Sequence, residues 1–281
     1  FPDEVLSGFR GPRHGVEGLR RLTGVSRGPI TCTALKPQGL APDELAGLAR
    51  SFALGGMHII KDDHGISNQA YSPFEARLRA CQAAVRRANV ESGLNALYVP
   101  TLSGTPSELF AQARLARGEG VRMVLVSPML IGLPAFEELV AQHLDPQCAV
   151  LAHPALGGAA RIAPELLFGK LFRLLGADAV IFTGYGGRFA YTPERCLAIS
   201  QAARAPWVST SGAIKPAMPV PAGGMTLERV DELAHFYGED TMLLIGGDLL
   251  IAGDELLART RAFADKVAGH DYREKHGKAR A

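Results

Sequence analysis

Length, composition and charge exclude several classes of protein. The chain has 281 residues, 47% of them hydrophobic and 21% charged, which is enough apolar material for a sizeable globular core. Its 30 basic and 28 acidic residues are spread along the chain and leave a net charge of +2, so charge predicts no nucleic-acid partner and no anionic membrane. No stretch reaches the ~18 consecutive apolar residues of a membrane helix, and we therefore expect a cytoplasmic protein.

Residues 29–270 alternate short apolar runs with longer amphipathic segments, which is typical of a parallel α/β sheet. Residues 1–28 are predicted to lead into this domain, and the locally basic residues 271–281 are predicted to form a solvated tail. Eight such units in about 250 residues is the size of a closed (β/α)8 barrel. The runs predict strands at residues 30–35, 57–61, 96–100, 122–126, 149–153, 179–183, 207–211 and 242–246.

A doubly wound open sheet is the competing architecture. It usually has fewer strands and an early G-x-G-x-x-G phosphate loop, and no such loop follows the first predicted strand. Helix starts also agree with the barrel, because Ser72 and Thr105 each place a capping hydroxyl before a proline, with a glutamate at the third helical position. The sequence therefore predicts the barrel.

Chemically active side chains follow the ends of the predicted strands. Lys36 comes after the first strand, Lys61, Asp63 and His64 come at the end of the second, and His153 ends the fifth. In a barrel of this kind the catalytic groups lie at the carboxyl ends of the strands, whereas the opposite rim serves stability. These five residues are therefore the predicted catalytic and metal-binding set.

The two-residue period of a strand places Lys61 and Asp63 on one face and Asp62 on the other. If the first face is the barrel interior, Lys61 lies close to Lys36 near the barrel axis. Two neighbouring ammonium groups lower the pKa of at least one of them, which suits a lysine that acts as a base, forms a Schiff base or reacts with carbon dioxide. The alternative is a structural ion pair between Lys61 and Asp63 that fills the top of the barrel.

Two glycine pairs predict a phosphate site. Gly223-Gly224 and Gly246-Gly247 follow the last two predicted strands, where barrels commonly bind phosphate through backbone N–H groups. Such pairs also occur as plain turns, but both stand at the expected places. Arg188, in the loop after the sixth strand, is either a further donor to the anion or a solvated loop arginine.

Four motifs follow one another along the chain: "ALKPQGL" (34–40), "GGMHIIKDDHGISNQAYSPFEAR" (55–77), "VSTSGAIKPAMPVPAGGM" (208–225) and "LLIGGDLL" (243–250). Together they resemble one family, the large chain of ribulose bisphosphate carboxylase with its RuBisCO-like relatives. The resemblance extends over essentially the whole chain and implies the C-terminal barrel domain of that family. The family also has a smaller N-terminal α+β domain, which we expect to be absent from this chain.

The resemblance implies roles for the residues at the strand ends. Lys61 matches the lysine that carbon dioxide converts to a carbamate and that then binds Mg²⁺, with Mn²⁺ as a substitute; Asp63 matches a carboxylate ligand. Lys36 matches the lysine that handles the substrate's proton. His64 stands where the family has a glutamate ligand, so it is expected to bind the metal or to act as an acid or base beside it. His153 matches a retained catalytic histidine, and the resemblance implies a homodimer or a larger homo-oligomer.

Departures from the family argue against carboxylation of ribulose bisphosphate. Arg188 replaces the loop lysine that orients carbon dioxide, and Pro154 replaces an arginine after His153. A metal site, an adjacent lysine and one phosphate site still suffice for reactions that pass through an enediolate. The resemblance therefore implies a metal-dependent lyase acting on a phosphorylated keto sugar acid, with 3-oxo-isoapionate-4-phosphate decarboxylase as the main prediction.

Several alternatives remain beside that prediction. Within the family they are a transcarboxylase-hydrolase on the same substrate and an enolase or isomerase of a methylthio-sugar phosphate. Outside it they are a metal-free aldolase that forms a Schiff base on Lys36 or Lys61, and a sugar-phosphate binder or assembly subunit without catalysis. Retention of Lys36, Lys61 and Asp63 together argues against the last of these.

Overall fold

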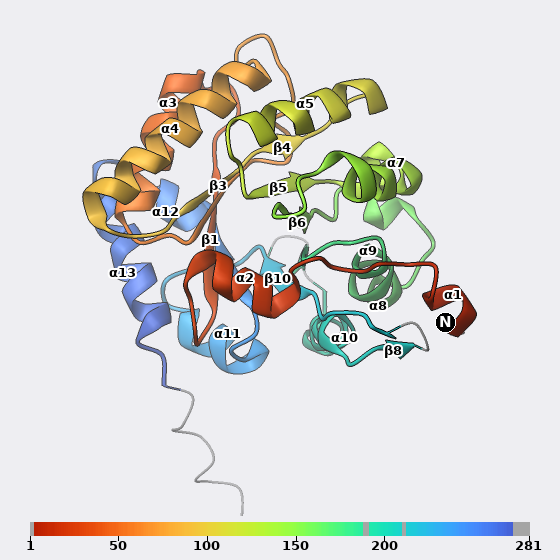
Figure 1. The fold of residues 1–281 in the computed structure, drawn as a ribbon. Coiled ribbons are helices and arrows are strands. Elements are labelled where there is room, and N and C mark those ends of the chain that lie inside the picture. The colour runs from red at the N-terminus through yellow and green to blue at the C-terminus, as the bar shows by residue number, and fades with distance from the viewer. Residues whose placement is uncertain (1–2, 188–190, 210–211, 272–281) are drawn as a thin grey trace, which may run out of the picture.

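A ring of parallel strands surrounded by helices forms the centre of the computed structural model, which describes residues 3–187, 191–209 and 212–271 (Figure 1). The strands and helices alternate along the chain, as the apolar runs predict. The strands of the ring are β1 Ile30–Leu35, β2 Ile59–Asp62, β3 Leu97–Val99, β4 Thr101–Leu102, β5 Met123–Val126, β6 Ala149–Ala152, β7 Ala179–Thr183, β10 Met218–Ala222 and β11 Met242–Ile245.

The ring closes through a strand that a proline divides. The strand order is β3-β2-β1-β11-β10-β7-β6-β5-β4, and its two ends, β3 and β4, are consecutive in the chain on either side of Pro100. Pro100 has no N–H for the ladder, but its carbonyl accepts a hydrogen bond from the Leu125 N–H at 2.9 Å. Counting β3 and β4 as one strand, the ring is the predicted (β/α)8 barrel, and this prediction is confirmed.

The predicted seventh strand, residues 207–211, is wrong. Val208–Ser209 (β8) instead pairs antiparallel with Gly212–Ala213 (β9) in a separate two-stranded sheet, while Thr210 and Ser211 lie outside the described residues. The seventh barrel strand is β10, whose sequence MPVPA contains two prolines and therefore does not resemble an interior strand.

Hydrogen bonding shows how a strand with two prolines fits in the ring. The Met218 N–H donates to the Asp178 carbonyl just before β7, so alternate N–H groups of β10 face β7, and β10 pairs with β7 over its whole length. Pro219 and Pro221 then occupy the positions that face β11, and pairing there is limited to Ala222 and Leu244. The Thr241 hydroxyl donates to the Pro219 carbonyl at 3.0 Å and compensates for part of the missing ladder.

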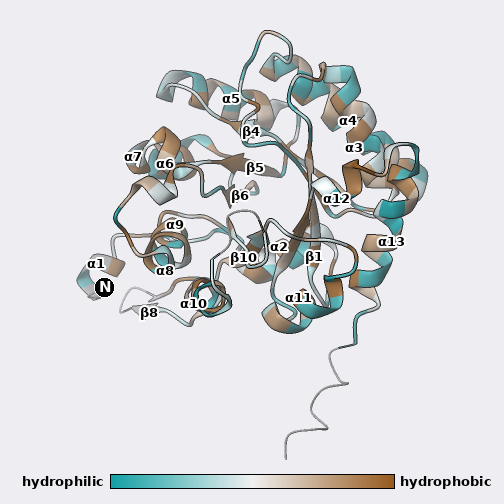
Figure 2. Cartoon of the chain, turned by 180° about the vertical axis from the view of Figure 1, so that it is seen from behind, coloured by the Kyte–Doolittle hydropathy of each residue, from teal (hydrophilic) through white to brown (hydrophobic). Residues whose placement is uncertain are grey.

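The helices cover the outside of the ring, and Figure 2 shows hydrophobic residues along the central strands with hydrophilic residues on the helices around them. Among the described residues, no helix is both long and apolar enough to cross a membrane. The predicted start at Thr105 is confirmed as a capping box with Glu108, whereas the helix after Ser72 begins at Phe74, whose N–H donates to Asn68 Oδ1 at 2.8 Å rather than to Ser72. The longer helices are α2 Gly15–Thr23, α3 Pro42–Leu54, α4 Phe74–Ser92, α5 Pro106–Gly118, α10 Pro193–Arg204, α11 Val230–Tyr237 and α13 Leu256–Ala268. The short ones are α1 Asp3–Leu6, α6 Pro128–Ile131, α7 Leu133–Glu138, α8 Pro164–Leu166, α9 Phe172–Leu174, α12 Gly247–Leu250 and the irregular turns η1 Leu139–His143, η2 Gly157–Ala159, η3 Leu167–Leu171 and η4 Gly253–Glu255.

Alternate residues of each strand belong to two separate apolar cores. In β5, Met123 and Leu125 pack inside the barrel, whereas Val124 and Val126 pack against the surrounding helices. The interior is therefore filled by side chains, as in other barrels of this type, and a ligand site is expected only at one of the ends.

Helix α2 closes the amino end of the barrel and lies over the centre of the strand ring in Figure 1. Its Val16, Leu19 and Leu22 join the interior core. The buried Asp178 carboxylate holds the start of this helix, because it accepts hydrogen bonds from the His14 and Gly15 N–H groups at 2.6 and 2.8 Å. The carboxyl ends of the strands are therefore the open end.

Candidate active site

A cavity of about 190 Å³ lies at the carboxyl ends of the strands. The structure brings all of the predicted site residues into its wall except Arg188, which lies outside the described residues. The wall consists of Lys36, Lys61, Asp63, His64, His153, Gly223, Gly224, Gly246 and Gly247, together with Ala34, Ile181, Ala222, Met225 and Leu244.

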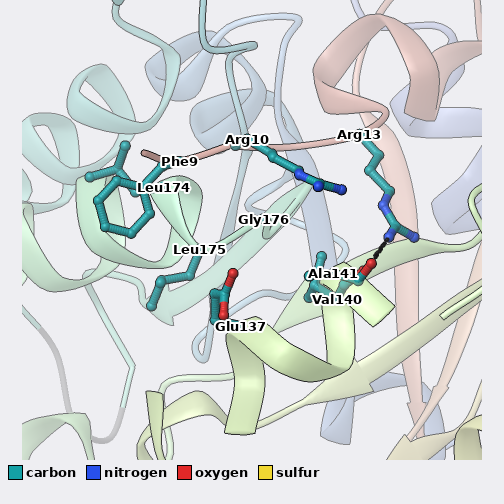
Figure 3. Close-up of a pocket in the computed structure, with 10 residues that line it drawn as sticks. Phe9, Arg10, Arg13, Glu137, Val140, Ala141, Leu174, Leu175 and Gly176 are labelled. Carbon is teal, nitrogen blue, oxygen red and sulfur yellow. Dashed lines mark hydrogen bonds between the residues drawn. The ribbon is translucent and has the colours of Figure 1, made fainter. Parts of the chain in front are cut away.

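A second pocket lies at the amino side of the barrel, between the segment before α2 and the turns η1 and α9 (Figure 3). There the Arg13 guanidinium donates to the backbone carbonyls of Val140 and, at 3.1 Å, of Asp145, and so fixes the N-terminal segment against the barrel. This pocket holds about 30 Å³ and contains none of the predicted site residues. The cavity at the carboxyl ends is the candidate site because the lysines, Asp63 and the two histidines meet there.

Lys61 points into the barrel from β2 and is only 3% exposed. Its Nζ donates to the Asp62 carbonyl at 3.1 Å. Burial lowers the pKa of Lys61, and the positive charge of Lys36 lowers it further, against the opposing influence of Asp63. The neutral amine is the form that reacts with carbon dioxide, so this environment favours carbamate formation.

Asp62 has a structural role on the opposite face of β2, as the period of two predicts. Its buried carboxylate accepts hydrogen bonds from Arg77 Nε at 3.0 Å and from the Tyr98 hydroxyl at 2.8 Å. Arg77, which is also fully buried, donates to the carbonyls of Ser72 and Ser67 at 2.6 and 2.7 Å. The pair therefore fixes the loop that follows Lys61 and Asp63.

Asp63 pairs with Lys36 rather than with Lys61 in the structure. Lys36 Nζ lies 3.4 Å from Asp63 Oδ2, while Oδ1 accepts a hydrogen bond from the Gly65 N–H at 2.9 Å. Burial acts to raise the pKa of Asp63, but the Gly65 N–H and the positive charges of Lys61, His64 and Lys36 outweigh it and lower the pKa overall. Asp63 is therefore an ionised carboxylate facing the cavity.

His64 and His153 form a stacked pair, with ring centroids 4.0 Å apart and planes inclined by 13°. Burial first, and then the positive charges of Lys61 and His64, lower the pKa of His153 to about 2, so its imidazole is neutral at physiological pH. The Ala155 N–H donates to His153 Nδ1 at 3.1 Å, which leaves the ring proton on Nε2. His153 is therefore a neutral hydrogen-bond donor.

The residues fit a hard metal ion under one condition. Among the described residues, no three His, Cys, Asp or Glu side chains are grouped as metal ligands. Asp63 offers a carboxylate, and His64 Nδ1 lies 3.5 Å from its Oδ1, but an unmodified lysine carries no oxygen donor. A carbamate on Lys61 would supply the missing oxygens, which are the ligands that Mg²⁺ prefers. The predicted metal set of Lys61, Asp63 and His64 therefore depends on that modification.

The glycine pairs leave open space in the cavity wall. A Cβ atom on Gly223, Gly246 or Gly247 would meet no neighbouring atom within 4 Å. Gly223 and Gly224 have φ angles of +90° and +71°, which other residues rarely adopt. Backbone thus lines this side of the cavity, as an anion site of N–H groups requires.

Sequence reasoning missed Arg229, which contacts the loop of Gly223 and Gly224 from outside the cavity. Its Nη1 donates to the Gly224 carbonyl at 2.8 Å. The local pattern with Glu232, three residues later, resembles an ordinary surface pair of a helix, so the sequence carries no signal for this contact.

Comparisons with known proteins show which family this chain is similar to. The sequence pattern described as "Ribulose bisphosphate carboxylase large chain, catalytic domain" matches residues 15–268. The "5-methylthioribulose-1-phosphate isomerase" of Rhodospirillum rubrum is 49% identical over 270 residues, covering 96% of this chain and 71% of that protein. The solved "Rubisco-like protein from Rhodopseudomonas palustris" is 47% identical, with a TM-score of 0.90 over 98% of this chain and 74% of the other.

Further relatives bear on the reaction and on assembly. The "2,3-diketo-5-methylthiopentyl-1-phosphate enolase" of Geobacillus kaustophilus is 32% identical and covers 94% of this chain and 64% of that protein. A solved relative from Pyrococcus horikoshii, described as octameric, is 27% identical, with a TM-score of 0.88 over 96% of this chain and 65% of the other. A second, from Hyperthermus butylicus and described as dimeric, is 26% identical, with a TM-score of 0.84 over 99% of this chain and 70% of the other.

These names correct the predicted reaction. The prediction of 3-oxo-isoapionate-4-phosphate decarboxylase, and with it the lyase class, is wrong, because the relatives are named as an isomerase and an enolase. The alternative of an enolase or isomerase of a methylthio-sugar phosphate fits better. The match over residues 15–268 and the similarity to RuBisCO-like proteins show that the chain belongs to the ribulose bisphosphate carboxylase large-chain family, on its RuBisCO-like side.

Proposed function

We propose that this chain is the catalytic barrel of a sugar-phosphate isomerase that acts on 5-methylthioribulose 1-phosphate. The observation that carries the proposal is one cavity lined by two unlike kinds of group. Lys36 and His153 offer groups that move or donate a proton, and the glycine loops leave space lined by backbone. The relative with 49% identity and that enzyme name supports the choice of substrate.

In this proposal the phosphate group lies against the glycine loops and the carbonyl carbon lies among the lysines. Neutral His153 donates its Nε2 proton to the carbonyl oxygen and stabilises the enediolate as it forms. Lys36, in its neutral form, takes a proton from the hydroxyl-bearing carbon beside the carbonyl and returns it to the former carbonyl carbon, while the hydroxyl proton passes back to His153 Nε2 and a new carbonyl forms. Asp63, 3.4 Å from Lys36, holds that side chain beside the substrate.

Mg²⁺ held by Asp63, His64 and the Lys61 carbamate would supply further positive charge to the enediolate oxygen. The chain's own residues supply the ligands that bind this metal ion. The buried Lys61 amine, whose pKa is lowered, reacts with carbon dioxide, and ionised Asp63 supplies a second anionic ligand. We also propose a homodimer or a larger homo-oligomer, in line with the assemblies named for solved relatives.

A proton NMR time course in deuterated water tests the reaction. The protein, supplied with Mg²⁺ and bicarbonate, is expected to convert 5-methylthioribulose 1-phosphate to an isomeric ketose phosphate and to place deuterium beside the carbonyl. Lys36→Met is expected to slow turnover by at least about 100-fold, the usual contribution of an acid–base group, while the exposed Lys170→Met is the matched control. Removal of the metal with a chelator is expected to abolish turnover.

The same assay separates the isomerase from the enolase. With 2,3-diketo-5-methylthiopentyl 1-phosphate in place of the ketose, deuterium exchange without any reaction of the ketose would overturn the isomerase in favour of the enolase. Reaction of neither compound would exclude both.

A further inference from the structure

The loops after β7 and β10 pack backbone against backbone. A Cβ atom on Gly187 would lie 2.9 Å from the carbonyl carbon of Gly223, and a Cβ atom on Gly224 would lie 2.8 Å from that of Gly186. Such distances exclude any side chain between the loops. The Gly184 N–H also donates to the Ala222 carbonyl at 2.8 Å. We call residues 184–187 together with 222–224 the two-loop junction.

Arg229 lies against both halves of this junction, in the turn before α11. Its Nη1 donates to the Gly224 carbonyl at 2.8 Å and to the Tyr185 carbonyl at 3.3 Å. Its guanidinium carbon also lies 5.1 Å from the centre of the Tyr185 ring, within the range of a cation–π contact. One planar group therefore ties the loop after β7 to the loop after β10.

Glu232 holds the guanidinium in this position. Arg229 Nε and Nη2 donate to its two carboxylate oxygens at 2.9 Å each, and the Tyr185 hydroxyl donates to Glu232 Oε1 at 2.7 Å. Arg229, Glu232 and Tyr185 thus form a closed ring of interactions around the junction. A lysine is unable to reproduce it, because a single ammonium group does not reach the carbonyls and a bidentate carboxylate together.

Arg229 does not line the cavity, so it acts on a ligand only through the backbone that it holds. Gly223 and Gly224 are that backbone, and their positive φ angles leave them free to adopt other conformations once the contact is lost. If Arg229 and Glu232 formed only an ordinary solvated ion pair, that pair would contribute little to stability, and its loss would leave ligand binding unchanged.

We infer that Arg229 is a positioning residue for phosphate binding, which holds the Gly223-Gly224 backbone in its anion-binding conformation through the contact with the Gly224 carbonyl. This inference rests on the phosphate site of the proposed function. It adds a residue outside the cavity that sets the affinity for the phosphate group without taking part in proton transfer.

Binding of inorganic phosphate, measured by isothermal titration calorimetry, tests the inference without any assumption about the sugar. Arg229→Gln and Arg229→Lys are both expected to raise the Kd for phosphate and the KM for the sugar phosphate roughly tenfold, as the loss of an aligned hydrogen bond implies. We expect kcat to stay within about twofold, because the proton-transfer groups are untouched. Glu232→Gln, a milder change, is expected to give a smaller rise in both constants.

Arg195→Gln is the matched control, because Arg195 forms a surface pair with Glu165 at 3.2 Å and, among the described residues, its side chain makes no hydrogen bond to the junction. It is expected to match the wild type. Wild-type affinity for phosphate in Arg229→Gln or Arg229→Lys would overturn the inference and leave the isomerase intact. Failure of the wild type to bind phosphate would overturn the inference together with the phosphate site. A rise in Kd in a protein that does not turn over the methylthio sugar would support the inference and refute the reaction.

Discussion

Lys61 shows how one residue's surroundings prepare its chemistry. The amine lies inside the barrel, where burial lowers its pKa, and its neighbours Asp63 and Lys36 pull that pKa in opposite directions. The strand period predicted from sequence that Lys61 and Asp63 share one face of the strand, and the fold shows that this face is the barrel interior. The partner of Asp63 was not predictable in the same way, because Lys36 and Lys61 both lie within reach and only the packing decides between them.

Lys61→Met is expected to stabilise the protein by about 1–3 kcal/mol near pH 7, because it removes the burial of a polar amine. The folded pKa of Lys61 lies below its ordinary 10.5, so between these two values the unfolded chain binds more protons and wild-type stability rises with pH. The advantage of the variant is therefore expected to shrink as the pH approaches 10.5.

Urea unfolding at pH 7 and at about pH 10 measures this difference. The exposed Lys170→Met serves as control and is expected to show the same small effect at both pH values. A variant that is less stable than the wild type at pH 7, or whose advantage grows with pH, would contradict the expectation that the buried amine destabilises the folded protein.

At the scale of elements, β2 and the loop after it depend on the ion pair of Asp62 and Arg77. Both side chains are fully buried, at 3.0 Å from each other, and Arg77 connects α4 to the loop through the carbonyls of Ser67 and Ser72. The sequence placed Asp62 on the face opposite Lys61 and Asp63 but carried no sign of this partner, because the two residues belong to different elements. The site's geometry therefore depends on a contact that only the fold creates.

Arg77→Met is expected to cost about 3–5 kcal/mol, because it leaves the Asp62 carboxylate buried without its cation. Arg79→Met, two residues along the same helix, removes an exposed arginine that pairs with Glu75 and Glu119, and it is expected to cost less than ~1 kcal/mol. Urea unfolding followed by circular dichroism compares the two. Equal losses would show that the Asp62 pair contributes no more than a surface pair.

At the scale of the whole molecule, the closed ring makes one end of the barrel available for chemistry. Helix α2 covers the amino end through Val16, Leu19 and Leu22, while Lys36, Lys61, Asp63, His64 and His153 converge at the other end. Strands far apart in the chain supply these groups, so the cavity exists only once β1, β2 and β6 belong to one closed sheet.

Assembly belongs to the same scale. Light scattering after size exclusion is expected to give a mass of at least twice the 29.9 kDa of one chain, as for the solved relatives described as dimeric and octameric. The mass is expected to stay constant on tenfold dilution, since an obligate interface is large and apolar. A single-chain mass at every concentration would refute the proposed oligomer.

The sequence by itself determined the number and order of the barrel units and the placement of Lys36, Lys61, Asp63 and His64 at strand ends, because apolar periodicity and short-range polarity are local properties. It misplaced the seventh strand, since the prolines of β10 oppose a strand locally and are accommodated only by neighbours on either side. The tertiary structure alone decided the pairing of Asp63 with Lys36, the stacking of His64 on His153 and the contact of Arg229 with Gly224. Each of these contacts joins residues that lie close together only because the ring closes or the loops pack, and no local sequence pattern predicts such a contact.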